Sequence, residues 1–336
     1  MYKGTILNIL LAVLMVVLAM LNLIYGSVSI PASQVLSILA GGTAEKASWN
    51  YIVMESRLPQ AVTAILCGAS LSTAGLLLQT TFRNPLAGPS ILGITNGASL
   101  GVGIVMLVTG GVISMGDNVI VGYFAVITGA FLGAMLVIVL LLAFASMVSN
   151  NLMLLIVGIM VSYLASSLVA LLNFFATADN IHNYVMWGMG SFSDVSPAQL
   201  PFFAMASIAG LALSALLIKP LNAMLLGDNY ASNLGINIMR TRQMLLLATG
   251  VLTAVVTAFC GPVAFIGLAV PHIARLVTRT SNHATLLPAT MLCGACIALT
   301  CNLISMLPQN TIIPINAVTP IFGAPVIIYI ICRKKW

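Results

Sequence analysis

Long apolar runs separated by short polar stretches dominate the sequence. No charged residue occurs between Asp117 and Asp179, or between Arg279 and Arg333. A helix of roughly 20 apolar residues crosses a bilayer, so each of these runs holds more than one span. Because hydrocarbon offers no partners to free backbone groups, the spans must be helical. The pattern predicts an all-α, polytopic membrane protein.

The apolar stretches divide into ten predicted spans within a single transmembrane domain covering residues 1–336. The eighth span is short, and Pro262 and Pro271 indicate an interruption there. An even number of spans places both termini on one side. The predicted spans cover residues 5–25, 58–80, 91–109, 119–143, 152–175, 197–218, 242–260, 265–278, 286–306 and 314–332.

Composition agrees with a membrane environment, because 5% of the residues are charged and 60% are hydrophobic. Soluble domains carry about 25% charged residues. The run from Ile6 to about Tyr25 exceeds the apolar core of a signal peptide, so an uncleaved first helix is expected.

The basic residues indicate the orientation. Only Lys46 and Arg57 fall at one set of span ends, and the positive-inside rule makes the opposite, basic-rich face cytoplasmic. Both termini are therefore expected in the cytoplasm, with the protein in the inner membrane. Scattered loop-end charges do not indicate nucleic-acid binding. The basic-rich ends hold Lys3, Arg83, Lys219, Arg240, Arg242, Arg275, Arg279, Arg333, Lys334 and Lys335.

The acidic residues limit the possible energy sources. Five of the six fall at the outer ends of spans, and Asp228 is the single inner one. Ion-coupled carriers usually place ionisable residues at mid-membrane, which this chain does not. The sequence also lacks a GxxxxGK[ST] phosphate-binding loop, so the chain is expected to bind no ATP of its own. An uphill transporter of this kind would take its energy from a partner.

Small residues recur at helical spacing in the third and fourth spans. Gly93, Gly97 and Gly101 share one face, and Gly129 with Gly133 repeats the spacing, which predicts close helix packing. The segment around Ser99 also matches the GxSxG pattern of a nucleophile elbow, but the strand-to-helix context is missing. Cys293 and Cys296 have CxxC spacing without a second pair, so no metal site is predicted.

A polar stripe on the fifth span is a candidate pathway. Ser162, Ser166 and Asn173 lie near one helix face. A hydrated lumen would use such a stripe, and so would interhelical hydrogen bonds. The sequence leaves both interpretations open. His272 and Arg275, one turn apart near the inner end of the eighth span, are similarly either helix-end anchors or contacts to a partner.

The connection at about 219–242 is the longest inner one. Its polar centre predicts one or two short helices bounded by glycines, in a loop long enough to contact a soluble partner. The residues assigned to this coupling role are Gly227, Asp228, Ala231, Leu234 and Gly235.

Several blocks in the sequence resemble the FecCD-type permeases, which import iron–siderophores, haem and cobalamin. The blocks follow the order of that family over nearly the whole chain. They are Arg57-Leu58-Pro59, Arg83-Asn84-Pro85-Leu86-Ala87-Gly88-Pro89, Trp187-Gly188 with Gly190-Ser191, Gly261-Pro262, Phe265-Ile266-Gly267-Leu268, Pro271-His272 with Arg275, and Gly323-Ala324-Pro325.

The resemblance implies a type II ABC importer permease that forms a homodimer in the membrane lipid. It implies two cytoplasmic ATPase subunits, which bind ATP and magnesium, and a periplasmic or lipid-anchored solute-binding protein. The 219–242 loop would dock on the ATPase, and spans five and ten would line the route. Spans 2–5 and 7–10 would form an inverted repeat. The inner gate would comprise Asn84, Leu86, Ser149 and Asn150.

Three positions depart from the family pattern. Gln60 replaces a second arginine, Asn302 replaces a common aspartate, and Met306 replaces a basic residue. Arg57 is retained and is expected to contact the binding protein.

The expected function is the permease of an ATP-driven importer for an iron–siderophore or related chelate, without enzymatic activity of its own. Cobalamin and haem are alternative cargoes. An ion-coupled carrier and an intramembrane enzyme remain alternatives of other classes. The enzyme alternative predicts that the purified single chain is active and that Ser99→Ala abolishes the activity.

Overall fold

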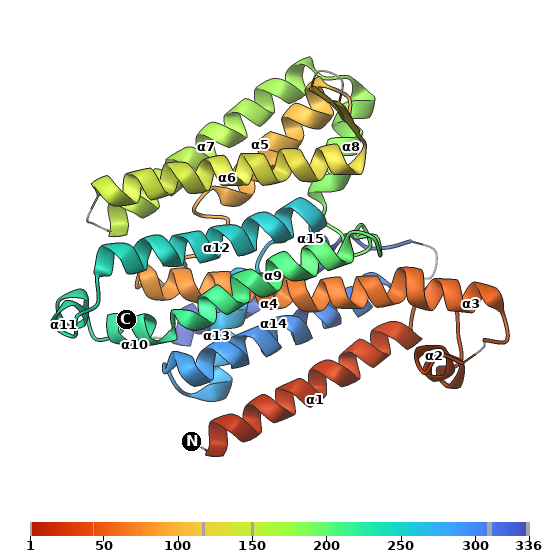
Figure 1. Cartoon of the computed structure of the whole chain (residues 1–336), viewed down its shortest axis with the longest axis horizontal. Helices are drawn as coiled ribbons and strands as arrows, with labels where there is room; N and C mark the ends of the chain where they lie inside the picture. The colour runs from red at the N-terminus through yellow and green to blue at the C-terminus, as the bar shows by residue number, and fades with distance from the viewer. Residues whose placement is uncertain (1, 43, 116–117, 149–150, 308–310, 334–336) are drawn as a thin grey trace.

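The computed structural model describes residues 2–333, apart from 43, 116–117, 149–150 and 308–310. Every predicted span contains a helix (Figure 1). Six helices are long and apolar enough to cross a membrane, and a bent pair at 200–224 adds a seventh. Three shorter apolar helices complete the set. The ten are α1 (Tyr2–Ile24), α4 (Leu58–Thr81), α5 (Ile94–Gly103), α6 (Tyr123–Met147), α7 (Asn151–Phe175), α9 (Leu200–Leu216), α12 (Ile238–Cys260), α13 (Ile266–Thr278), α14 (His283–Ser305) and α15 (Ile315–Arg333).

Short elements connect these helices. They are α2 (Ala32–Leu39), α3 (Ala47–Tyr51), α8 (Ala178–Gly188), α10 (Ile218–Met224), α11 (Asp228–Asn233), the π-helical turns η1 (Ile52–Arg57) and η2 (Ile104–Val108), and a hairpin of β1 (Val112–Met115) and β2 (Asn118–Val121). The hairpin corrects the expected start of the fourth span at residue 119. Val119, Ile120 and Val121 favour a strand, and Gly122, with φ 69°, separates that strand from α6.

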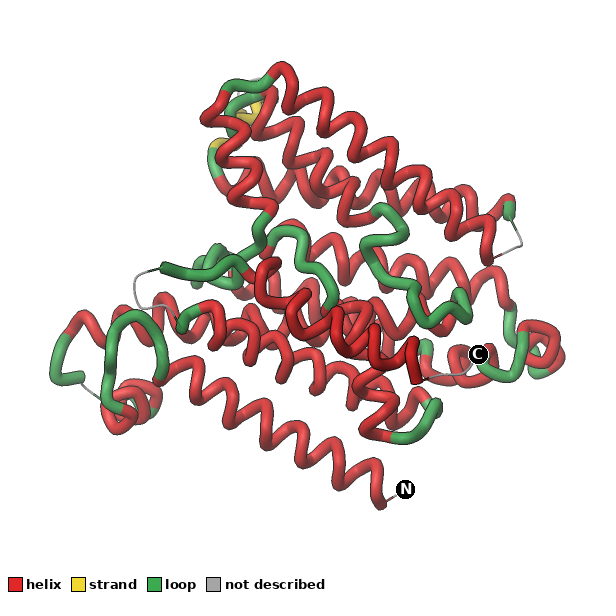
Figure 2. Tube along the Cα trace, turned by 180° about the vertical axis from the view of Figure 1, so that it is seen from behind, coloured by secondary structure: helices red, strands yellow, loops and turns green. Residues whose placement is uncertain are grey.

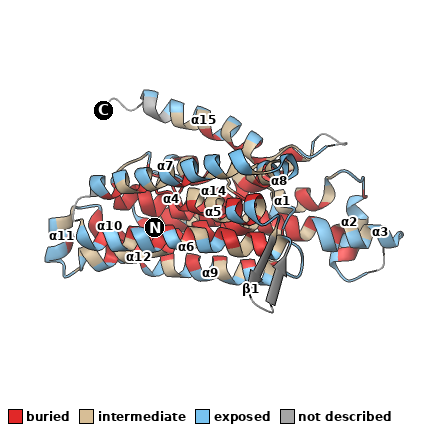
Figure 3. Ribbon diagram, turned by 90° about the horizontal axis from the view of Figure 1, so that it is seen from above, coloured by how far each residue is buried: buried red, intermediate tan, exposed pale blue. Residues whose placement is uncertain are grey.

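The helices form two groups joined by α12. In Figure 1, α5, α6 and α7 lie together above α12, and α1, α4, α13 and α14 lie together below it. The same division is visible from behind in Figure 2. Each group has its own apolar core, and the buried residues of α12 contribute to both. Figure 3 shows the buried positions concentrated along α4 and its neighbours.

Glycines set the closest helix contacts. A Cβ built on Gly101 would overlap the carbonyl oxygen of Gly129, and one on Gly133 would overlap that of Gly97. The predicted packing of these two spans is therefore confirmed for Gly97 and Gly101, whereas Gly93 precedes α5 with φ 80° and meets α7. On α4, Gly75 meets the backbone of Gly267 in the same way. Small residues allow the backbones to approach where lipid cannot drive association.

The exposed basic residues Arg83, Lys219, Arg240 and Arg279 lie where α4 ends, α10 to α12 meet and α13 ends, which we call the basic end. The N- and C-termini both lie toward this end (Figure 1). The opposite end carries α2, α3, α8 and the hairpin.

Candidate functional site

The loop between α4 and α5 carries the predicted gate residues Asn84 and Leu86 at the basic end. The Asn84 side-chain oxygen accepts a hydrogen bond from the Leu86 amide at 2.9 Å, which closes a tight turn. The His272 ring nitrogen Nε2 donates to the Pro85 carbonyl at 2.7 Å and so ties the turn to α13. The Leu86 side chain remains exposed. The structure therefore presents an ordered loop with an apolar side chain at its tip.

A second set of contacts fixes α13 and α14 to the end of α4. Arg275 donates to the Gln79 side chain at 2.6 Å, and Gln79 donates to the Leu268 carbonyl at 3.1 Å. The His283 ring contacts the Thr80 hydroxyl at 2.9 Å and the Asn222 side chain at 2.9 Å. His272 and Arg275 therefore bond to other segments of the same chain, which neither of their two predicted roles included.

The predicted coupling loop contains α10 and α11. Helix α11 follows Gly227, with φ 114°, and is followed by Gly235, with φ 82°, so glycines bound it as expected. Ala231 is buried against α10 and α12. The opposite surface is apolar yet exposed, and is formed by Leu225, Leu226, Tyr230 and Leu234.

An ion pair joins this loop to the gate loop. Arg83 donates to the Asp228 carboxylate at 2.5 Å and to the Met224 carbonyl at 3.4 Å. The pair is partly open to solvent, with side-chain exposures of 51% for Arg83 and 35% for Asp228. The first residue of α11 is thereby tied to the residue preceding Asn84.

The other predicted gate residues, Ser149 and Asn150, lie outside the described residues. Arg242 approaches the adjoining segment and donates to the Val148 carbonyl at 3.4 Å.

The polar stripe on α7 does not act as one unit. Ser162 donates to the Gly158 carbonyl of its own helix at 2.9 Å and packs against Gly93. Ser166 is exposed, and the Asn173 side-chain oxygen is buried without a partner among the described residues. Interhelical packing therefore accounts for Ser162, whereas a role in lining the pathway remains a prediction for Ser166 and Asn173.

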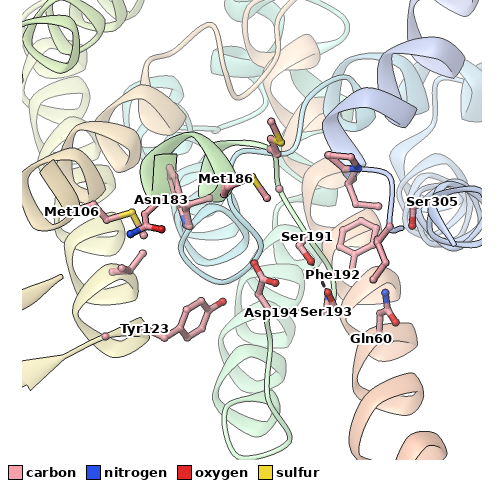
Figure 4. Close-up of a pocket in the computed structure, with 18 of the residues that line it drawn as sticks. Gln60, Met106, Tyr123, Asn183, Met186, Ser191, Phe192, Ser193, Asp194 and Ser305 are labelled. Atoms are coloured by element: carbon pink, nitrogen blue, oxygen red, sulfur yellow. Dashed lines mark hydrogen bonds between the residues drawn. The ribbon is translucent and has the colours of Figure 1, made fainter. Parts of the chain in front are cut away.

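A cavity of about 690 Å³ lies at the opposite end, between the two helix groups (Figure 4). Met106 and Tyr123 reach it from α5–α6, α8 supplies a second wall, and Gln60 with Ser305 approaches from α4 and α14. No pattern in the sequence predicted this cavity. The sequence feature that could have indicated it is the Trp187–Ser191 block, which is followed by Asp194 and contributes to the lining. The polar lining residues are Gln60, Asn180, Asn183, Ser191, Ser193, Asp194, Asn302 and Ser305.

The chemistry of the cavity is that of amides, hydroxyls and one carboxylate. Among the described residues that line it there is no lysine, arginine or histidine. Desolvation raises the pKa of Asp194, and a hydrogen bond from Ser191 partly opposes that shift. The Ser191 and Ser193 hydroxyls contact each other at 2.7 Å. Such a lining favours a neutral or cationic solute with hydrogen-bonding groups.

Comparison with known proteins identifies the family of this chain. The model of the FecCD transport family matches residues 14–333. The chain belongs to the FecCD transport family. It is 34% identical over 326 residues to the vitamin B12 import system permease protein BtuC of Klebsiella pneumoniae subsp. pneumoniae, covering 97% of this chain and 93% of that protein. The BtuC of Photorhabdus laumondii subsp. laumondii is 34% identical over 292 residues, covering 84% and 82%.

A solved structure supports the same architecture. It is described as an inward-facing conformation of an ABC transporter assigned to the metal-chelate type. The TM-score is 0.84 at 28% identity, covering 97% of this chain and 99% of that one. This FecCD chain is therefore a multi-pass permease of an ABC importer.

Two departures from the FecCD pattern contact each other. Gln60 donates to the Asn302 side chain at 3.1 Å, and Asn302 donates to Asn22 of α1 at 2.8 Å. All three are buried. Where the family commonly has an arginine and an aspartate, this chain has a neutral amide pair, so neither side chain is left with an unpaired buried charge.

The retained Arg57 makes hydrogen bonds within the chain. Its side chain is only 4% exposed and donates to the carbonyls of Leu23 and Ile24, both at 2.8 Å, and to that of Val28. The Leu23 and Ile24 carbonyls end α1 and lack helical partners, so the guanidinium caps that helix. In this chain the guanidinium is buried and hydrogen-bonded, and its contact with the binding protein stays a prediction.

Proposed function

We propose that this FecCD permease imports a corrinoid of the cobalamin type. The observation that carries the proposal is the amide- and hydroxyl-lined cavity without a basic residue, in a chain similar along 97% of its length to a vitamin B12 permease. A corrinoid carries peripheral amides, which match amide and hydroxyl partners. A strongly anionic chelate would meet the Asp194 carboxylate and no compensating cation.

The partners follow from the same proposal. Two ATPase subunits bind ATP and magnesium and dock on the coupling loop, where the exposed Leu225, Leu226, Tyr230 and Leu234 supply apolar contacts. A second copy of the chain completes the pathway along the exposed α7 and α15. The basic end faces the cytoplasm together with both termini. A solute-binding protein delivers cargo to the opposite end.

Transport then proceeds by alternating access. ATP binding moves the coupling loops, and the helix groups rock so that one gate closes while the other opens. ATP must bind the two conformations with different affinity for this to occur. Substitutions across Gly227–Gly235 are therefore expected to separate hydrolysis from uptake.

The first test is affinity purification of the tagged chain in mild detergent from cells expressing its native operon. Mass spectrometry should recover one ATPase subunit per permease. A chain that purifies alone while the ATPase is expressed would overturn the importer mechanism and favour a self-sufficient carrier or enzyme.

A second experiment tests the cargo. The complex, reconstituted in liposomes with its binding protein, is supplied with radiolabelled cyanocobalamin or with a neutral ferric hydroxamate. ATP-dependent uptake of cyanocobalamin supports the proposal. Uptake of the ferric hydroxamate alone supports the second candidate, an iron-chelate permease, which the similarity to a metal-chelate-type transporter favours.

A further inference from the structure

The contacts of Asp228 set it apart within the basic end. It is the single acidic residue among the inner connections and the first residue of α11. Its carboxylate pairs with Arg83 at 2.5 Å. The pair joins α11 to the end of α4, 145 residues away in the sequence.

Arg83 leads into the predicted gate loop, because it directly precedes the Asn84–Leu86 turn between α4 and α5. His272 of α13 ties the middle of this turn to the rest of the protein by donating to the Pro85 carbonyl. A displacement of Arg83 therefore acts on a turn that is fixed two residues further along the chain.

The backbone of Arg83 is strained. Its φ is 47°, a conformation that side-chain-bearing residues seldom adopt and that persists only where the surroundings enforce it. The ion pair is also half-open to water, and such pairs are weak. A weak contact that fixes a strained turn can be broken and remade, whereas a buried bond would hold the loop permanently.

We infer that Asp228 is a positioning residue that relays movement of the coupling helix α11 through Arg83 to the α4–α5 turn. The inference rests on the proposed function, since the movement originates in the ATPase. Asp228 acts on gate position and contacts neither nucleotide nor cargo.

Spin labels test the relay without knowledge of the cargo. Cys332, the exposed cysteine among those described, is replaced by Ser, and Leu86→Cys carries the label, which gives one pair per dimer. Pulsed electron paramagnetic resonance of the purified permease–ATPase complex then measures the label-to-label distance without nucleotide and after trapping with ATP, magnesium and vanadate. The parent chain should change its distance distribution on trapping.

In the trapped state, Asp228→Asn and Arg83→Asn should each lower the ratio of complexes with the changed label-to-label distance to complexes with the nucleotide-free distance. The expected decrease is at least about fivefold, the lower range of allosteric coupling. Arg279→Asn is the matched control, because Arg279 is also exposed at the basic end and also has positive φ, at 52°. It should shift as the parent does. The exchange of Arg83→Asp with Asp228→Arg should recover part of the response.

Three results would overturn the relay. A normal shift in both single variants would show that the ion pair transmits nothing, even though the importer mechanism stands. Loss of the ATPase from the Asp228→Asn complex would make the residue a docking contact. Failure of the parent chain to bind any ATPase would remove the relay together with the proposed function.

Discussion

Helices α4 and α7 are both apolar, yet they occupy opposite environments. The segment 47–81 that contains α4 has a mean hydropathy of 1.9, and 83% of its apolar window is buried. The segment 152–175 of α7 has a higher value of 2.3, and 17% is buried. Hydropathy therefore reports residence in the membrane and does not report burial within the protein.

Side-chain size separates the two helices. Gly68 and Gly75 of α4 meet the backbones of Gly294 and Gly267. Helix α7 instead presents large side chains outward, with Tyr163 at 69% and Phe174 at 81% exposure. Since lipid is as apolar as the protein interior, small residues that permit close contact decide which helix becomes central.

Polar residues differ in the same way. On α4, Gln60, Gln79 and Thr80 bond to other helices, whereas Ser162 of α7 bonds within its own helix. Ser72 of α4 also donates to the Thr290 carbonyl of α14 at 3.0 Å. The polar groups of α4 stabilise contacts between helices, whereas on α7 Ser162 bonds within its helix and Ser166 is exposed.

The largest effect is expected at the α4–α13 contact. Gly75→Leu places a side chain inside the Gly267 backbone, so the helices cannot approach and the folded protein should be lost. Ala170→Leu on the exposed surface of α7 is the matched control and should leave the yield unchanged. Fluorescence-detected size-exclusion chromatography measures both. A monodisperse Gly75→Leu protein would contradict the central position of α4.

The next effect concerns the amide pair. Asn302→Asp buries a carboxylate opposite a neutral amide and should lower the free energy of unfolding by about 3 kcal/mol. Adding Gln60→Arg supplies the missing cation and should recover about 1–3 kcal/mol of that loss.

Thermal unfolding of the single and double variants gives this coupling energy. Asn183→Asp, at an exposed position on the same cavity, is the control and should change stability by less than about 0.5 kcal/mol. Additive losses in the double variant would show that the two positions are independent.

The sequence predicted the membrane class, the positions of the ten helices and the glycine contacts, because these depend on local pattern and spacing. It did not predict the cavity, whose walls come from segments more than 200 residues apart, such as Gln60 and Ser305. Nor did it predict the burial of Arg57. From the sequence alone, an arginine at the outer end of a span is expected to be exposed. Its burial depends on the end of α1 lying beside it, which the sequence does not show.

A smaller effect is expected for the pH dependence of stability, through Asp194 in the cavity between the two helix groups. Desolvation raises the pKa of Asp194, so its ionised form destabilises the fold, and this contribution disappears as the carboxylate becomes protonated. Asp194→Asn should therefore be more stable than the parent at pH 8, by less than about 1 kcal/mol for a solvated group. The difference should shrink as the pH falls toward about 4. A stability difference between Asp194→Asn and the parent that does not change with pH would exclude ionisation of Asp194 as its cause.

The smallest change to stability accompanies a test of α7. Ser166→Cys should alter the free energy of unfolding by less than about 0.5 kcal/mol, because Ser166 is exposed. If α7 lines the pathway, a membrane-impermeant thiol reagent should label this cysteine in the Cys332→Ser background, at a rate that changes on ATP trapping. Ser72→Cys on buried α4 should remain unlabelled. Absence of labelling at position 166 would place α7 against lipid or a second chain.

Helix α1 lies outside the two sets of spans, 2–5 and 7–10, that the family resemblance implies, yet it makes hydrogen bonds beside the first set and within the second. Its terminal carbonyls receive Arg57, beside the first set, and its Asn22 receives Asn302, in the second. The two sets of spans are therefore not independent units, because only one of two separately expressed halves could contain α1. A split transporter should assemble only when α1 is supplied, even as an independent peptide.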